Sequence, residues 1–141
     1  MKYNSFRPRI HGNTKVAYDY ITKKEKRILV IGDIHAPFVL DGYLEFCKET
    51  YARHNCNQVI FIGDILDNHY SSFHNTDPNG MGGGEELEHA IEVIQQWSEE
   101  FPKADVLIGN HDRMIMRKAF DSDVPKQWIK SYNEVLGTKW N

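Results

Sequence analysis

The sequence contains little cysteine and no hydrophobic run long enough to cross a membrane. Its two cysteines, Cys47 and Cys56, do not form a CxxC pair, so they provide neither a disulfide framework nor a thiol-rich zinc site. The apolar runs fall short of the roughly 18 residues that a membrane span needs. The N-terminus also lacks the apolar core of a signal peptide. We therefore expect a cytoplasmic protein with reduced thiols and no membrane partner.

The sequence also lacks a strong excess of either charge. It has 17 basic and 20 acidic residues among 141, for a net charge of -3, whereas a nucleic-acid-binding domain is usually strongly basic. Two basic clusters, Arg7/Arg9 and 23–27, give a nucleic-acid partner weak support, but a solvated face is the favoured interpretation. The length fits one domain. We predict a polar N-terminal extension over 1–27 and one domain over 28–141.

Three short apolar runs, each followed by glycine and a polar residue, predict the strands of a sheet. The runs span 28–31, 59–62 and 106–108. Continuous apolar runs are typical of strands buried on both faces of a parallel sheet. A helix capped by Asp41 and a second helix from Glu85 to just before Pro102 separate the runs. The order predicts an α/β fold with a βαβαβ parallel sheet, followed by one or two helices broken at Pro125.

The polar residues that follow these runs are metal-ligand types. They are Asp33 and His35, then Asp64 and Asp67, then Asn110, His111 and Asp112. Because ligands of open α/β sheets bind beyond the carboxyl ends of the strands, we expect these side chains to converge. Carboxylates and imidazoles suit divalent metals, and a metal pair can clamp a phosphate. An aspartate after a strand is often only a turn former or helix cap, but three matching loops favour the metal site.

The segments 32–35, 63–67 and 109–112 contain the motifs DxH, GDxxD and GNHD. In this order and spacing they resemble the first three signature motifs of the calcineurin-like metallophosphoesterases, over about residues 28–115. The resemblance implies the first half of that family's sandwich fold. It also implies a hydrolase, such as a phosphatase, in which a metal-bound hydroxide at a dinuclear centre attacks phosphomonoesters or diesters. Manganese is the first expectation for both metal ions, and iron, zinc or nickel are alternatives.

The resemblance also implies a role for each motif residue. Asp33 and His35 would bind the first metal, Asp64 would bridge both metals, and Asn110 would bind the second metal and the substrate phosphate. His111 would protonate the leaving group or stabilise charge beside the phosphate.

Four further residues have roles that are less directly implied. Asp112 would orient and polarise His111. Asp67 would stabilise the conformation of its loop without binding the metal directly. His69 and His74 follow closely and could be substitute ligands or substrate contacts. Surface positions are the favoured interpretation for both histidines.

The sequence departs from the family pattern after the third motif. No histidine follows His111, so the family's later GHxH segment is absent, and nothing after residue 113 predicts a strand. A complementing C-terminal chain or a homo-oligomer would then complete the site. A partly uncovered sheet would itself favour association. The alternative is a non-catalytic metal- or phosphate-binding fragment.

Overall fold

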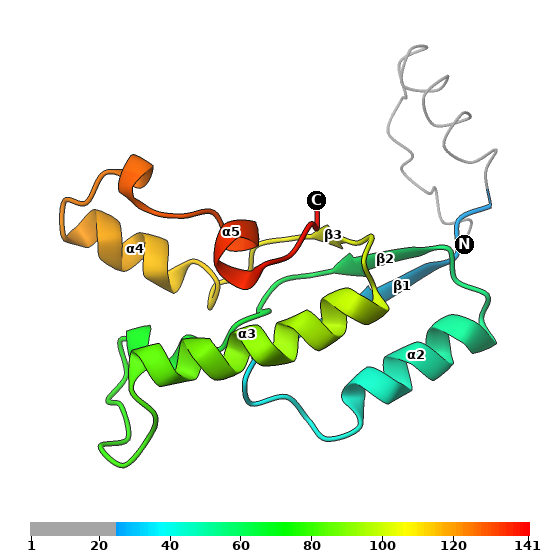
Figure 1. The fold of residues 1–141 in the computed structure, drawn as a ribbon, viewed down its shortest axis with the longest axis horizontal. Helices are drawn as coiled ribbons and strands as arrows, with labels where there is room; N and C mark the ends of the chain where they lie inside the picture. The colour runs from blue at the N-terminus through cyan, green and yellow to red at the C-terminus, as the bar shows by residue number, and fades with distance from the viewer. Residues whose placement is uncertain (1–24) are drawn as a thin grey trace, which may run out of the picture.

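The structure, a computed structural model, describes residues 25–141. Most of the predicted N-terminal extension, including Arg7/Arg9, therefore lies outside the described residues. A parallel sheet in the order β1-β2-β3 forms the centre, from β1 (Ile28–Ile31), β2 (Gln58–Phe61) and β3 (Asp105–Val106). Figure 1 shows α2 (Tyr43–Arg53) and α3 (Gly83–Glu100) together on one side of this sheet. The predicted α/β fold is confirmed, although β2 and β3 begin one residue earlier than expected and β3 has only two residues.

The core lies between the sheet and these two helices. Side chains alternate in burial along β1 and β2, and the inward set meets one buried face of each helix. Phe61, at the centre, has no exposed surface, and its ring lies 6.1 Å from that of Trp97 and 4.7 Å from that of Trp140. Burying such rings removes a large apolar area from water, which drives the packing of α3 onto the sheet.

The opposite face of the sheet is bare in the part of the chain that the structure describes. Val30 is 57% exposed, Ile62 52% and Leu107 56%. The pairing of Val30 with Ile60 and of Phe61 with Val106 places these three residues on one face. The expectation that the strands are buried on both faces is therefore wrong for residues 25–141, because both α2 and α3 pack on the other side.

The ends of the helices differ in how well the sequence predicts them. The predicted cap, Asp41, is wrong: α2 follows Gly42, which has a left-handed φ of 78° and no side-chain cap. The start of α3 lies two residues before Glu85, and its end before Pro102 is confirmed. Glycine replaces an acidic cap at Gly42 because the chain must enter the helix through a conformation that other residues adopt at a cost.

The C-terminal segment contains α4 (Met114–Asp121), the short 3-10 helix η2 (Lys126–Trp128) and α5 (Tyr132–Leu136), so the break at Pro125 is confirmed. A capping box starts α5: the Ser131 hydroxyl accepts from the Glu134 N–H, and the Glu134 carboxylate accepts from the Ser131 N–H at 2.8 Å. The Ser131 hydroxyl also donates to the Glu134 carboxylate at 2.6 Å, and this bond first, with the Ser131 N–H second, lowers the pKa of Glu134. At the open edge of β3, the Val106 N–H donates to the Asn141 carbonyl at 2.9 Å. None of the helices described is both long and apolar enough to cross a membrane.

Candidate metal centre

The loops after β1 and β2 lie side by side beyond the carboxyl ends of the strands. The His35 N–H donates to the Asp64 carbonyl at 2.9 Å, and Ala36 pairs with Leu66 in an isolated parallel bridge. Asp33, His35 and Asp64 all have left-handed φ angles between 49° and 51°. This region is uncommon for residues with a side chain, but aspartate and histidine tolerate it better than most. The backbone pairing holds His35 and Asp64 in these conformations and so sets the direction of their side chains.

The loop after β3 approaches the loop after β2 closely at two glycines. A Cβ on Gly63 would lie 2.6 Å from the Gly109 nitrogen, and a Cβ on Gly109 would lie 2.2 Å from Asp64 Oδ1. Real Cβ atoms do not approach other atoms so closely, so both positions require glycine. The close approach lets the His111 N–H donate to Asp64 Oδ1 at 2.9 Å. The Asp64 carboxylate is thereby held in place before any metal binds.

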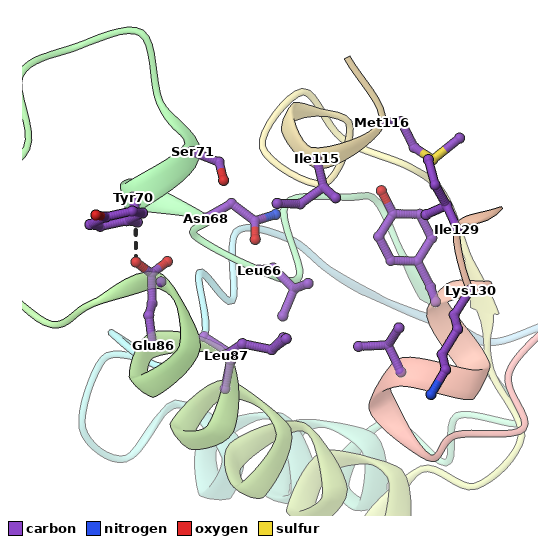
Figure 2. A pocket seen from close by; sticks show the side chains of 15 residues that line it. Leu66, Asn68, Tyr70, Ser71, Glu86, Leu87, Ile115, Met116, Ile129 and Lys130 are labelled. Carbon is purple, nitrogen blue, oxygen red and sulfur yellow. Dashed lines mark hydrogen bonds between the residues drawn. The ribbon is translucent and has the colours of Figure 1, made fainter. Parts of the chain in front are cut away.

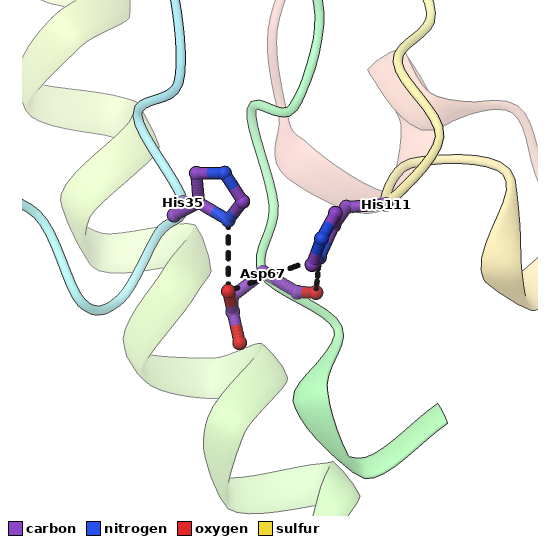
Figure 3. A group of neighbouring side chains, drawn as sticks. All are labelled: His35, Asp67 and His111. Carbon is purple, nitrogen blue, oxygen red and sulfur yellow. Dashed lines mark hydrogen bonds and ion pairs between the residues drawn. The ribbon is translucent and has the colours of Figure 1, made fainter. Parts of the chain in front are cut away.

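Asp67 lies between the two histidines of the site (Figure 3). Its Oδ1 lies 2.8 Å from His35 Nδ1, and its backbone carbonyl lies 2.6 Å from His111 Nδ1. A carbonyl oxygen can only accept a hydrogen bond, so His111 carries its proton on Nδ1. The Asp67 carboxylate favours the same tautomer in His35. Both imidazoles therefore keep a free lone pair on Nε2.

Two groups of side chains place ligand atoms within 4.8 Å of one another. They are Asp33, His35 and Asp64, and His35, Asp67 and His111. In the second group, Nδ1 of both rings is occupied by Asp67, whereas in the first group His35 Nε2 is free and lies 3.8 Å from Asp33 Oδ1. An imidazole that donates to a carboxylate and binds metal with its other nitrogen is a common arrangement. The donor set of the first group thus fits a divalent metal ion.

Asp112 is buried between the loops after β2 and β3. It is 2% exposed; the Leu66 N–H donates to its Oδ1 at 3.1 Å and the Gly109 N–H to its Oδ2 at 2.8 Å. The side chain thus joins the loops after β2 and β3, while His111 Nδ1 contacts Asp67; the role of Asp112 in orienting His111 stays a prediction. The hydroxyl of Tyr132 donates to the Asp112 carbonyl. Burial, and secondarily the Asp112 charge, raises the pKa of Tyr132.

The remaining predicted residues, Asn110, His69 and His74, are all exposed. Asn110 is exposed and makes no side-chain hydrogen bond within residues 25–141. The His69 N–H donates to the Glu86 carboxylate at 2.8 Å, and the His74 N–H donates to the Ser72 hydroxyl at 3.1 Å. The structure does not bring these two histidines into either candidate metal group of the described chain.

Sequence reasoning missed Asn68 as a contact of the site. Its Nδ2 donates to the His111 carbonyl at 3.0 Å, and its φ of 51° is left-handed. Asparagine is enriched in this backbone region, which was the one available signal in the sequence. Asn68 thus links the end of the GDxxD motif to the GNHD motif.

The comparison with protein families agrees with this geometry. A family model described as calcineurin-like phosphoesterase matches residues 26–139, most of the chain. Searches of curated proteins and of solved structures gave no significant match. The chain therefore belongs to the calcineurin-like phosphoesterase family.

Proposed function

We propose that this chain hydrolyses phosphomonoesters or diesters with two divalent metal ions bound at the carboxyl edge of the sheet. The observation that carries the proposal is the group of Asp33, His35 and Asp64, whose ligand atoms lie within 4.8 Å of one another in a chain of this family. The hydrogen bonds to His35 and Asp64 described above hold two of these ligands in place. Such preorganisation is what metal and phosphate chemistry needs from a protein.

We propose the ligands of each metal from the family resemblance. Asp33 and His35 would hold the first ion, Asp64 would lie between the two, and Asn110 would hold the second. Manganese is our first choice because oxygen ligands dominate the set, and iron, zinc or nickel also suit mixed oxygen and nitrogen ligands. Bound divalent ions supply Lewis acidity, which polarises a phosphate and makes water more acidic.

His111 is the residue that we propose moves a proton. Its Nδ1–H is held by the Asp67 carbonyl, so Nε2 is the atom that takes up or donates the proton. The Asp67 carboxylate, 3.8 Å from His111 Nδ1, would stabilise the protonated ring. In that form the imidazolium can donate to the leaving-group oxygen.

The decisive test is hydrolysis of bis-p-nitrophenyl phosphate by the purified chain with added manganese. We expect turnover that EDTA abolishes, that Asp64→Asn removes, and that His111→Ala lowers by about 100-fold or more. His54→Ala changes an exposed histidine outside the site and serves as the matched control. Full activity in both Asp64→Asn and His111→Ala would refute the assignment.

A non-catalytic metal- or phosphate-binding fragment is the rival function. It is supported by the overlap of the two candidate metal groups in residues 25–141, which share His35 and so do not form two separate ligand sets. The rival predicts weak manganese binding and no turnover. Calorimetric titration with Mn²⁺ beside the hydrolysis assay separates the two functions, because only the enzyme couples binding to turnover.

We also propose that a second copy or a complementing chain covers the bare face of the sheet. The exposed Val30, Ile62 and Leu107 support this, since monomeric proteins rarely leave contiguous apolar faces in water. Light scattering of the purified chain should detect association, and Val30→Lys should reduce it. A monodisperse, stable monomer would contradict the proposal.

A further inference from the structure

A cavity lies beside the candidate metal centre, and none of the residues assigned above to metal binding or proton transfer lines it. Its volume is about 170 Å³, and its lining comes from the 3-10 helix η1 (His69–Ser71), from α3, from α4 and from the segment 129–135. Figure 2 shows Leu66, Leu87 and Ile115, from three separate segments, around a common space. Most of the lining is apolar, and its polar members include Asn68 and Ser71 and the charged Glu86 and Lys130.

The wall formed by η1 is held against α3. Glu86 is 5% exposed, and its two carboxylate oxygens accept the N–H groups of His69 at 2.8 Å and Tyr70 at 3.1 Å. Gly83 allows the Tyr70 ring to pack closely, because a Cβ there would lie 2.9 Å from Tyr70 Cδ1. The two carboxylate oxygens of Glu86 are thus hydrogen-bonded to backbone N–H groups, so the negative charge of Glu86 is compensated by the protein itself.

The cavity is built from the neighbours of the metal-site residues. Ala36 follows His35 in the chain, and Leu66 and Asn68 lie on either side of Asp67. Asn68 contacts both regions, since it lines the cavity and donates to the His111 carbonyl at 3.0 Å. The cavity therefore shares two chain segments with the candidate metal centre, and a ligand in it would contact direct sequence neighbours of His35 and Asp67.

We propose that this cavity binds an apolar group about the size of a benzene ring, carried by the substrate or by a separate small molecule. An engineered cavity of about 150 Å³ lined by leucine, isoleucine and phenylalanine stays dry and binds benzene. The present cavity is slightly larger and partly open to solvent, and most of its lining is likewise apolar. An apolar ring gains by leaving water. Of the two charged side chains in the lining, Glu86 is paired with backbone N–H groups and Lys130 is exposed to solvent.

Benzene is the probe for a direct binding test on the metal-free chain. We expect saturable shifts in the methyl NMR signals of Leu66, Ile115 and Met116, which line the cavity. Leu87→Trp should weaken binding at least tenfold, because the indole would occupy the space. Leu40→Trp is the matched control, since Leu40 is 76% exposed and does not line the cavity.

Absence of shifts, or equal binding by Leu87→Trp and the wild-type chain, would overturn the proposal. If Leu87→Trp does not fold, Ile129→Trp fills the cavity from the opposite wall and carries the same expectation. Because the test is made without metal, failure of the proposed hydrolysis would not affect its result.

Kinetics of the wild-type chain distinguish the two sources of the ring. If the substrate carries it, benzene should inhibit hydrolysis of phenyl phosphate competitively and leave hydrolysis of methyl phosphate unchanged. If a separate molecule carries it, benzene should affect both reactions alike. Either result supports the cavity as a binding site, provided that the NMR shifts are observed.

Discussion

Replacing Asp112 by asparagine tests whether this side chain is a structural link between loops. The carboxylate accepts the Leu66 N–H and the Gly109 N–H from within the protein interior. An asparagine keeps one acceptor oxygen, without charge, and turns an NH₂ group toward the other N–H. The loss of charge assistance and one unsatisfied buried N–H together should cost about 2–4 kcal/mol in unfolding free energy.

Urea denaturation of the metal-free chain measures this difference without a contribution from metal binding. Asp33→Asn is the control, because its side chain is 77% exposed and asparagine tolerates the left-handed backbone at that position. We expect the control to change the unfolding free energy by less than about 0.5 kcal/mol. If Asp112→Asn is as stable as the control, the link that we infer from the two hydrogen bonds is wrong.

Three further predictions concern other parts of the chain. Gly109→Ala should weaken manganese binding by about 10–100-fold in calorimetry, because the added Cβ must displace the loop that carries Asp64. An unchanged affinity would contradict the close approach of the two loops. Ser131→Ala should lower the unfolding free energy by about 1 kcal/mol. The pKa of Glu134 is lowered in the folded chain, so folding favours its ionised carboxylate. The difference in unfolding free energy between the variant and the wild-type chain should therefore shrink as falling pH protonates Glu134. At about pH 8, Cys56 should react with a thiol reagent well before Cys47, because burial raises the pKa of the Cys47 thiol; equal rates in the folded chain would refute this.

Much of the fold could be predicted because its signals are local. Apolar runs followed by glycine indicated the strands, and the apolar stripe of α3 together with Pro102 indicated that helix and its end. The cap of α2 could not be predicted, because the chain enters the helix through Gly42 in a left-handed conformation that Asp41 does not share. Local propensity favoured the acidic residue, but the path of the backbone decided the cap.

The sequence by itself determined the motifs, their order and the family, because ligand types and glycine spacing are properties of short segments. Only the tertiary structure decided that Asp67 contacts both histidines, which lie 32 and 44 positions away, and that Asp112 binds backbone groups. It also decided that one face of the described sheet is bare and that a cavity adjoins the metal centre. The physical reason is that tautomers, close approaches and cavities depend on which distant segments the packed core brings within a few ångströms of one another.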